Sequence, residues 1–446
     1  MFGQEEGMML QRTLIGLLSP EHEGQNVRVC GWVEHIRNKK QIVFLVIRDQ
    51  TGSVQVTYIK SDGTAEWTEH LEGLTLESAV DITGRLVKNP HVKLGEKEII
   101  PESITVVGLA EKPIPLGIHP QLQDRLDWRF LDLRTPQQRL IFEIQTTAEH
   151  AMRQWWMDQG FLEIHSPKLM GHGSESGAEL FSLPYFGTTA YLAQSPQFYK
   201  QMAMAAGFDR VFEIGPVFRA NPSFTSRHDT EFTSVDVEVA WIDSHDDVMQ
   251  VEEKWVTYFL GRVAEECGQR LKKLYNREVV IPSLPFPRIP MAHVHEILAE
   301  MGHIIPPETG GDLDPEGERL ICKWVKEHHG HEFVFVTDWP IGVRPFYHMR
   351  HAEHPNLTKS FDLLWNGLEV TSGAQREHRY DILRAQAIEK GLDPSPIQFY
   401  LDFFRFGMPP HGGFGFGLTR MLMLLTGVMN VREVTYLYRG PNRLTP

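Results

Sequence analysis

The residues best suited to phosphate chemistry lie in residues 211–238, where two apolar runs flank a polar loop that holds Arg219, Arg227, His228 and Glu231. Two apolar runs around a polar loop predict a β-hairpin. Arginines held on a hairpin can bind phosphate oxygens with paired N–H donors, which a single surface arginine does less well. The alternative is a hairpin whose arginines form ordinary surface ion pairs. This segment is therefore a candidate triphosphate site.

A second candidate lies in residues 361–376, where an apolar run is followed by Glu369 and Ser372 and ends at Arg376. A carboxylate beside a hydroxyl group can hold Mg²⁺ through oxygen ligands. The alternative is a strand without a metal, because the Glu-x-x-Ser pattern is common in strands. The segment indicates a magnesium site only in combination with a phosphate-binding neighbour.

A third candidate is the glycine-rich run in residues 409–420, which precedes an apolar helix expected over 421–429. Glycine lets the backbone approach a ligand closely, and Arg420 at the end of the run can reach a phosphate. A simple turn is the alternative. The order of the three segments along the chain is much more specific than any one of them.

The composition is that of a globular protein with more than one domain. A chain of 446 residues, 41% of them hydrophobic, is too long for one ordinary core. No run approaches the roughly 18 apolar residues of a membrane span, and residues 1–11 lack a signal-peptide pattern, so we expect a soluble cytoplasmic protein. The three cysteines show no CxxC spacing, which argues against a disulfide framework or a thiolate zinc site. His328, His329 and His331 are expected to form a solvated surface run.

The N-terminal residues predict a small β-barrel. The net charge of −14 argues against a nucleic-acid partner, but residues 28–48 hold five basic residues and one acidic residue. Residues 26–58 alternate apolar and polar side chains with a break at 49–52, which predicts antiparallel strands joined by a tight turn. Further strands are expected at 79–87 and 98–107. Five short strands suggest an OB-fold, a barrel that binds single-stranded nucleic acid.

We expect three parts: a barrel domain over 1–110, a proline-containing linker over 111–137, and a larger domain over 138–446 with a peripheral insertion at about 269–354. A long amphipathic helix is expected over 138–159, followed by a strand at 161–164. The larger domain mixes helices with strands of antiparallel type. The absence of a βαβ rhythm and of a GxGxxG motif argues against a Rossmann or P-loop fold, and the predicted fold class is α+β.

The ordered segments resemble the class II aminoacyl-tRNA synthetases of the aspartyl, archaeal and eukaryotic-like type. Residues 161–167 are similar to motif 1, which in that family lies at the dimer interface and here ends at Pro167. Residues 218–228 are similar to motif 2, and residues 415–420 to motif 3. The resemblance spans nearly the whole chain and implies an OB-fold anticodon-binding barrel followed by a catalytic domain on an antiparallel sheet flanked by helices.

The resemblance implies a ligase that uses ATP with Mg²⁺. The α-carboxylate of aspartate is already ionised at pH 7, so the reaction needs positioning and charge neutralisation rather than a general base. The implied catalytic residues are Arg219, Glu369 and Arg420, with Mg²⁺ held by Glu369 and Ser372. The implied ATP-binding positions are Arg219, Ala220, Asn221, Arg227, His228, Asp229, Glu369, Gly417, Leu418, Thr419 and Arg420.

Charge favours aspartate as the amino acid, because a second carboxylate taken from water needs cationic partners. Lys200 and Arg376 match the residues that face the substrate side chain in aspartyl enzymes, whereas asparaginyl relatives do not keep the lysine. The resemblance also places Glu175, in the mobile loop 174–177, on the substrate ammonium group. The remaining implied aspartate-binding positions are Gln197, Arg219, Asp236 and Ser372.

The barrel is expected to bind the anticodon of tRNA(Asp). Phe44 can stack on a base and Gln55 can bond its edge, as the matching positions do in the family, and Arg37 suits phosphate. For Phe44 the alternative is a place in the barrel core. Enzymes restricted to tRNA(Asp) have a tryptophan and a lysine where this chain has Glu34 and His91. The departure favours charging of both tRNA(Asp) and tRNA(Asn), which would make a tRNA-dependent amidotransferase a partner.

Two positions depart from the family pattern in the ATP site. Asn221 stands where motif 2 usually has a glutamate, and Thr419 stands where motif 3 usually has an acid. These departures leave three alternatives: a strictly discriminating aspartyl enzyme, a tRNA-independent paralogue that makes aspartyl-adenylate, and a non-catalytic tRNA-binding protein. The barrel argues against the paralogue, and the presence of Arg219, Glu369 and Arg420 argues against the non-catalytic protein.

Overall fold

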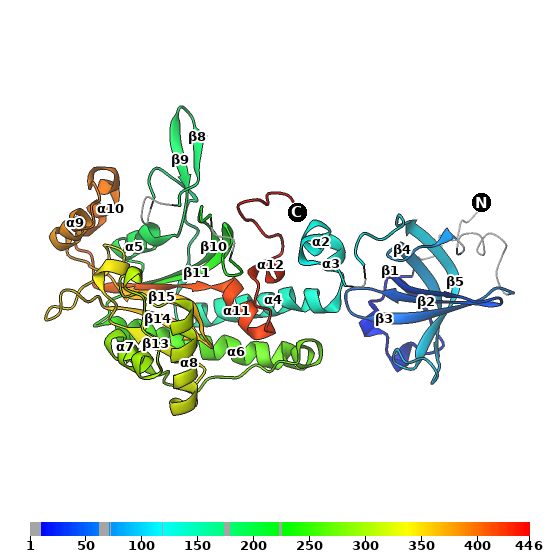
Figure 1. Cartoon of the computed structure of the whole chain (residues 1–446). Coiled ribbons are helices and arrows are strands. Elements are labelled where there is room, and N and C mark those ends of the chain that lie inside the picture. The colour runs from blue at the N-terminus through cyan, green and yellow to red at the C-terminus, as the bar shows by residue number, and fades with distance from the viewer. Residues whose placement is uncertain (1–9, 62–70, 72, 118, 174–178, 223–224) are drawn as a thin grey trace. The chain divides into compact units, whose positions relative to one another are not determined.

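The computed structural model describes residues 10–61, 71, 73–117, 119–173, 179–222 and 225–446. The chain divides into two compact units, Met1–Arg134 and Thr135–Pro446 (Figure 1). None of the helices in the part of the chain that is described combines the length and the hydrophobicity needed to cross a membrane.

The first unit contains a closed barrel of five strands in the order β1-β2-β3-β5-β4 (Figure 1). The strands are β1 (Asn26–Asn38), β2 (Ile42–Arg48), β3 (Ser53–Ile59), β4 (Ala79–Lys88) and β5 (Lys97–Gly108). They are followed by the short helices α2 (Leu122–Asp127) and α3 (Arg129–Asp132). The predicted OB-fold barrel is confirmed.

Alternation of side chains builds the barrel, because successive residues of a strand point to opposite faces. Val43, Leu45 and Ile47 of β2 are buried in the barrel core, where they pack with Val54 and Val56 of β3. The turn between these strands is tight: the Asp49 N–H donates to the Gly52 carbonyl group at 2.9 Å. The Asp49 side chain accepts a hydrogen bond from the Thr51 N–H at 2.7 Å, an Asx turn of the kind the 49–52 sequence predicts.

The second unit is built on an eight-stranded sheet in the order β12-β13-β14-β15-β16-β11-β10-β6. Neighbouring strands are antiparallel except at the two ends, where β6 pairs with β10 and β12 pairs with β13 in parallel. The sheet is therefore mixed, although its centre is antiparallel as predicted. Its strands are β6 (Leu162–Glu163), β10 (Arg210–Phe218), β11 (Glu231–Ala240), β12 (Arg288–Pro290), β13 (Phe333–Thr337), β14 (Ser360–Trp365), β15 (Leu368–Gln375) and β16 (His411–Gly417).

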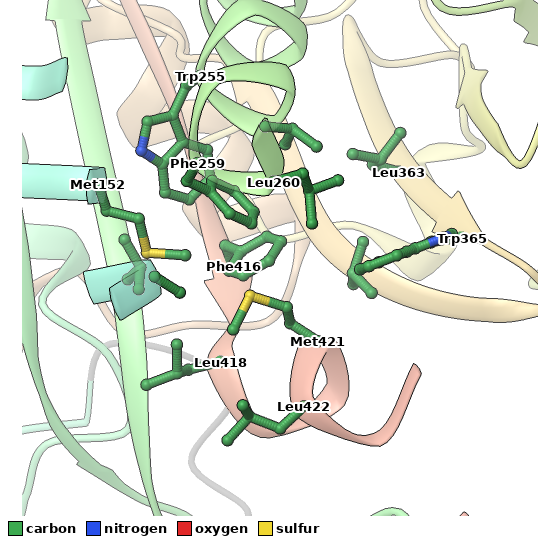
Figure 2. Packing of buried hydrophobic residues seen from close by; sticks show 14 of the residues in the cluster. Met152, Trp255, Phe259, Leu260, Leu363, Trp365, Phe416, Leu418, Met421 and Leu422 are labelled. Carbon is green, nitrogen blue, oxygen red and sulfur yellow. The ribbon is translucent and has the colours of Figure 1, made fainter. Parts of the chain in front are cut away.

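Two long helices, α4 (Pro136–Asp158) and α6 (His245–Tyr275), pack against each other and contribute to the main core. The side chain of Thr135 caps α4, and Ser244 with Asp247 forms a capping box at the start of α6. Figure 2 shows Met152 of α4 and Trp255 of α6 meeting side chains of the sheet, among them Phe416. The predicted helix over 138–159 thus lies against the site-bearing strands.

The remaining elements surround this core. A three-stranded sheet contains β7 (Leu169–Met170), β8 (Ser182–Tyr185) and β9 (Thr188–Leu192). The other helices are α5 (Gln197–Ala205), α7 (Met291–Glu300), α8 (Pro315–His329), α9 (Tyr380–Glu389), α10 (Gln398–Leu401), α11 (Leu418–Thr426) and α12 (Val431–Val434). Single 3₁₀ turns occupy Ile15–Leu17, Pro20–His22, Pro307–Thr309, Ile341–Val343, Ser395–Ile397 and Asp402–Arg405.

The first residues of segment 269–354, expected to be a peripheral insertion, complete α6, and strands β12 and β13 form one end of the main sheet. His331 is not part of a solvated run as expected, because it is buried and its ring nitrogens contact the Phe333 and Ser283 carbonyl groups. The helix expected over 421–429 begins three residues earlier, at Leu418, and ends at Thr426 because Gly427 takes a left-handed conformation with φ +72°. Residues His411–Gly417 of the glycine run form strand β16 rather than a simple turn.

Candidate active site

A cavity of about 390 Å³ opens on the sheet of the second unit, and most of the predicted site residues line it. It collects side chains from α5, the β10–β11 hairpin, β15, β16 and the start of α11. The predicted residues in its wall are Gln197, Lys200, Arg219, Asn221, Arg227, His228, Asp229, Asp236, Glu369, Ser372, Arg376, Gly417, Thr419 and Arg420. Segments far apart in sequence therefore meet as predicted.

Four predicted residues lie elsewhere or outside the described part of the chain. Glu175 belongs to residues 174–178, which the structure does not describe. Leu418 packs in the main core, so its side chain does not face the cavity. Ala220 is absent from the cavity wall, and its N–H donates to the carbonyl group of Glu179, a wall residue, at 2.8 Å. Pro167 is exposed between β6 and β7.

Strand β16 forms the floor of the cavity, and its residues alternate between phenylalanines that face the core and glycines that face the cavity side. Phe414 and Phe416 pack in the core, whereas Gly413 and Gly415 lie opposite Glu238 and Asp236 of β11. A Cβ atom on Gly413 would lie 2.0 Å from the Val237 carbonyl oxygen, and one on Gly415 would lie 3.2 Å from Asp236 Oδ1. The glycines are needed because larger side chains would fill the space that the acidic residues occupy.

A buried group of four charges lies at one end of the cavity, where Lys200, Asp236 and Arg376 line the wall and Glu238 lies behind them. Lys200 Nζ lies 3.1 Å from Asp236 Oδ1 and 3.3 Å from Glu238 Oε2. Arg376 Nε donates to Glu238 Oε1 at 3.0 Å. Although burial raises the pKa of Glu238, the charges of Arg376 and Lys200 bring it below its ordinary value, so this carboxylate is ionised.

Two histidines next to this group are neutral. His348 Nε2 lies 3.1 Å from Arg376 Nη1, and burial together with the Arg376 charge lowers the pKa of His348 well below its usual range. His411 is fully buried, and burial lowers its pKa to about 4. Its Nε2 lies 2.9 Å from Gln201 Nε2, so His411 accepts a hydrogen bond there and uses Nδ1–H toward the Pro409 carbonyl group. The positive charge at this end of the cavity therefore comes from Lys200 and Arg376.

Glu369 and Ser372 lie three residues apart, a spacing that in a regular strand puts side chains on opposite faces. In β15, Thr371 pairs with Leu363 and Glu369 pairs with the next residue, Leu364, so Val370 is an extra residue at a β-bulge. The bulge brings Glu369 and Ser372 to one face, where Ser372 Oγ lies 3.4 Å from Glu369 Oε1. The structure thus makes the oxygen pair that the sequence predicts.

The arginine of the glycine run is fixed against the same strand. Arg420 Nη1 donates to the Glu369 carbonyl oxygen at 2.7 Å and lies 3.4 Å from the Glu369 carboxylate. Arg219 is more exposed, and its guanidinium group lies 5.4 Å from the centre of the Phe232 ring. Burial and the charges of Arg420, Arg219 and Arg227 lower the pKa of His228. Three arginines thus line this part of the cavity, an arrangement that suits an anionic ligand.

Sequence reasoning missed four charged residues of the site: Glu238, Glu318, Arg344 and Asp362. Asp362 pairs with Ser372 across the β14–β15 ladder, and Ser372 Oγ donates to it at 2.6 Å. Arg344 Nη2 donates to Asp362 at 2.6 Å. Burial raises the pKa of Asp362 to about 6, against the opposing charge of Arg344. A signal existed for Asp362, because it is the one acid in the largely apolar strand β14. Glu238 follows the predicted Asp236 by two residues on β11, a spacing that puts both acids on the same face of the strand.

A second cavity of about 250 Å³ adjoins the first and shares Arg227, His228, Glu369 and Arg420 with it. Glu318 of α8 lies in its wall and forms an ion pair with Arg227. Among the described residues, no group of three or more histidine, cysteine or acidic side chains is arranged to hold a metal ion by itself.

The barrel brings its predicted residues to the surface of β1, β2 and β3. Phe44 is half-buried between core residues, so its ring lies on the face opposite the core. The Arg37 guanidinium group and Lys39 Nζ lie 5.9 and 5.8 Å from the centre of that ring. Gln55, on the outer face of β3, donates to Glu98 at 2.9 Å. The alternative that Phe44 is a core residue is therefore wrong.

Glu34 and His91 flank this surface. Glu34 lies at a β-bulge between Val33 and His35, and its carboxylate accepts a hydrogen bond from Ser53 at 2.8 Å. His91 is exposed in the turn between β4 and β5, and its N–H donates to Asn89 Oδ1 at 3.0 Å. Asn89 in turn donates to Glu98 at 2.8 Å, which connects the His91 turn to the side chain that holds Gln55.

Comparison with known proteins agrees with both units. Residues 121–439 match the family of tRNA synthetases class II (D, K and N), and residues 27–107 match the OB-fold nucleic acid binding domain. The chain belongs to the class II tRNA synthetases. It is thus an aminoacyl-tRNA synthetase, a ligase that forms aminoacyl-tRNA.

Relatives of this class II synthetase cover almost its whole length. It is 42% identical over 442 residues to the aspartate–tRNA(Asp) ligase of Pyrococcus abyssi, covering 98% of this chain and 100% of the relative. It is 44% identical over 429 residues to the aspartate–tRNA(Asp/Asn) ligase of Aeropyrum pernix, covering 95% and 96%. The two relatives differ in the tRNA that their names specify.

Solved structures of the same class superimpose closely. The asparaginyl-tRNA synthetase of Pyrococcus horikoshii, complexed with asparaginyl-adenylate, gives a TM-score of 0.90 at 32% identity and covers 98% of this chain and 100% of its own. The aspartyl-tRNA synthetase of Entamoeba histolytica gives 0.88 at 33% identity, covering 98% and 93%. Fold similarity alone therefore does not separate aspartyl from asparaginyl members, and the cavity residues must decide.

Proposed function

We propose that this synthetase activates L-aspartate with ATP to aspartyl-adenylate and transfers the aspartyl group to the 3′ end of tRNA(Asp) and tRNA(Asn). The observation that carries the choice of aspartate is the buried arrangement of Lys200 and Arg376 around Glu238. If Asp236 pairs with the substrate ammonium group, Lys200, Arg376 and Glu238 together leave one positive charge. One side-chain carboxylate matches that charge, whereas the neutral amide of asparagine leaves it unpaired.

Binding of ATP is proposed for the cationic part of the cavity. Arg219 is assigned to the α-phosphate, and Arg227, His228 and Arg420 are assigned to the outer phosphates. Donors fixed before the reaction stabilise the charge that develops on the α-phosphate when the aspartate carboxylate attacks it. No general base is required, because the attacking carboxylate is already ionised at neutral pH.

Magnesium is proposed to accompany ATP, with Glu369 and Ser372 as its protein ligands. The carboxylate and hydroxyl oxygens that the β15 bulge brings to one face are of the type Mg²⁺ takes, and one or two such ligands suffice when phosphates complete the shell. When bound, the ion supplies positive charge that offsets the phosphate charge. Arg420, fixed to Glu369, then orients the same carboxylate.

Binding of the anticodon is proposed for the barrel face that holds Arg37, Phe44 and Gln55. Charging of tRNA(Asn) as well as tRNA(Asp) rests on Glu34 and His91, which replace the tryptophan and lysine of enzymes restricted to tRNA(Asp). A product mischarged on tRNA(Asn) would require a tRNA-dependent amidotransferase as a partner. Replacing both positions together, Glu34→Trp with His91→Lys, is expected to reduce charging of tRNA(Asn) at least about tenfold and to preserve charging of tRNA(Asp).

Three further proposals concern the assembly, the surroundings and the domain limits of the enzyme. Motif 1, ending at the exposed Pro167, supports a homodimer, and size-exclusion chromatography with light scattering would measure twice the chain mass. A cytoplasmic location fits a synthetase that acts on tRNA. We assign residues 1–110 to anticodon binding, 111–137 to a hinge, and 138–446 to catalysis.

The decisive experiment is ATP–pyrophosphate exchange with aspartate and, separately, with asparagine, followed by charging of purified tRNA(Asp) and tRNA(Asn). We expect aspartate-dependent exchange and aspartylation of both tRNAs. Exchange without transfer to either tRNA would instead favour a tRNA-independent adenylate-forming enzyme. Absence of both activities would favour a non-catalytic tRNA-binding protein, and transfer to tRNA(Asp) alone would establish a discriminating enzyme.

A further inference from the structure

Glu318 of helix α8 contacts Arg227, an arginine of the candidate ATP site. Glu318 Oε2 lies 3.1 Å from Arg227 Nη1, and the two side chains are only 13% and 22% exposed. Among the described residues, Arg227 forms no other ion pair. The pair lies in the wall of the second cavity, and Arg227 also lines the first. Glu318 therefore reaches the nucleotide region through Arg227.

The two partners differ in how firmly the fold holds them. Glu318 is in the first turn of α8, whose start is fixed by Asp314: its Oδ1 accepts a hydrogen bond from the Gly317 N–H at 2.8 Å. Ile321 and Val325 of the same helix are buried in a core cluster. The helix N-terminus also favours a negative charge. Glu318 thus has a well-defined place in the fold.

Arg227, in contrast, extends from a turn between β10 and β11. The backbone of this turn is held on its other side, where the Val431 N–H donates to the Ser226 carbonyl oxygen at 2.8 Å. The long Arg227 side chain has several rotatable bonds, and ordering such a side chain during ligand binding weakens the binding. Glu318 engages Nη1, which leaves other N–H donors of the planar guanidinium group for a phosphate.

We propose that Glu318 is a positioning residue for ATP, holding Arg227 in the conformation that binds an outer phosphate. The inference rests on the proposed function. The acids Glu318 and Glu369 would disfavour a phosphate nearby if both were fully ionised. Burial and the charge of Glu369 together raise the pKa of Glu318 to about 7, against the opposing charge of Arg227. The role that we assign to the Glu318 carboxyl group is its contact with Arg227.

A double-mutant cycle of Glu318 and Arg227, measured by ATP–pyrophosphate exchange, distinguishes the positioning of Arg227 from a general effect on the fold. Glu318→Gln removes the charge at nearly constant shape, and we expect the KM for ATP to rise about two- to tenfold, the change that corresponds to ordering one long side chain. The kcat and the KM for aspartate should stay within about twofold. In the Arg227→Ala background, Glu318→Gln should have no further effect, because its target is gone.

Glu316→Gln is the matched control. Glu316 lies two residues earlier on α8, is paired with Arg319 at the surface, and does not line either cavity. The Glu316→Gln substitution should leave the KM for ATP unchanged. Thermal unfolding should show that all variants remain folded.

Three outcomes would overturn the proposal: a lower KM for ATP in Glu318→Gln, which would mean competition for Arg227; additive effects of the two substitutions; or equal changes in the KM for ATP and for aspartate. Failure of the proposed function looks different, because the wild-type enzyme would then show no aspartate-dependent exchange.

Discussion

Arg376 and Glu238 form an ion pair that is almost completely removed from solvent, with Nε to Oε1 at 3.0 Å and side-chain exposures of 3% and 0%. The pair joins the end of β15 to the middle of β11. Lys200 of α5 approaches the same carboxylate, so three elements meet at one negative charge. A buried carboxylate between two cations fixes their positions before a substrate arrives, which reduces the reorganisation that binding requires.

Replacing Lys200 by methionine is expected to raise the KM for aspartate about 100-fold or more, because the substrate carboxylate loses a desolvated partner. The KM for ATP should change little. Steady-state exchange measures both constants. Lys168→Met is the control, since Lys168 forms a similar ion pair with Glu213 at 2.6 Å outside the cavity. Equal effects of the two substitutions on aspartate would contradict the assignment of Lys200.

Replacing Arg219 by alanine is expected to lower the rate of adenylate formation by about two orders of magnitude or more, the usual effect of removing a fixed donor from a developing charge. Single-turnover formation of aspartyl-adenylate measures this rate. Arg210→Ala is the control: Arg210 begins β10, the strand that Arg219 follows, does not line the cavity, and donates to the Gln159 carbonyl oxygen. A near-normal rate in the Arg219 variant would remove Arg219 from the mechanism.

Two glycines of β16 should respond differently to alanine. A Cβ atom on Gly413 would lie 2.0 Å from a backbone oxygen of β11, so Gly413→Ala should separate the strands and destabilise the fold by several kcal/mol, about 3 or more. Gly415→Ala would approach only the Asp236 carboxylate, at 3.2 Å, and should fold normally with a KM for aspartate raised about tenfold. Thermal unfolding and exchange kinetics distinguish the two cases; equal stability of both variants would argue against the close β11–β16 packing.

Glu252 of α6 provides a prediction about pH and stability. It is fully buried, and burial raises its pKa to about 8, with Asp362 and Glu253 adding to the effect. Between the unfolded pKa of about 4.3 and this value, the folded protein holds one more proton than the unfolded chain, so stability falls as pH rises. Glu252→Gln should remove this pH dependence. From pH 5 to pH 8, the free energy of unfolding of the variant should therefore rise relative to that of wild type by about 2–4 kcal/mol.

Urea unfolding at the two pH values measures the change in Glu252→Gln. Glu266→Gln, at an exposed position of the same helix, is the control and should show no such difference. A pH-independent difference between Glu252→Gln and wild type would mean that Glu252 is ionised in the folded protein.

Much of this enzyme could be read from its sequence because the relevant signals are local. Alternation in residues 26–58 predicts the barrel, and an amphipathic pattern in residues 138–159 predicts the helix that became α4. Each of these two features depends on neighbours in the chain, which the sequence displays directly. The order of Arg219, Glu369 and Arg420 indicates the class of site only through a family resemblance, because these residues are far apart in the chain.

Other features depend on contacts between distant segments. The bulge at Val370 is set by pairing with β14, and the Glu318–Arg227 contact joins residues 91 positions apart, so neither has a local pattern. Strands β12 and β13 of segment 269–354 were not predicted because they are short, with three and five residues, and β13 joins the main sheet by pairing with β14. The range of tRNA substrates, the dimer and the roles of individual site residues stay predictions.

The alternation along β16 has a consequence for how this gene can change. Deleting one residue within His411–Gly417 would move each later residue of this strand to the opposite face of the sheet. Phenylalanine rings would then point toward the substrate and glycines toward the core. Core and cavity would be lost in the same event. Insertions and deletions should therefore be excluded from this strand throughout the lineage of the enzyme, even where conservative substitutions of its phenylalanines are accepted.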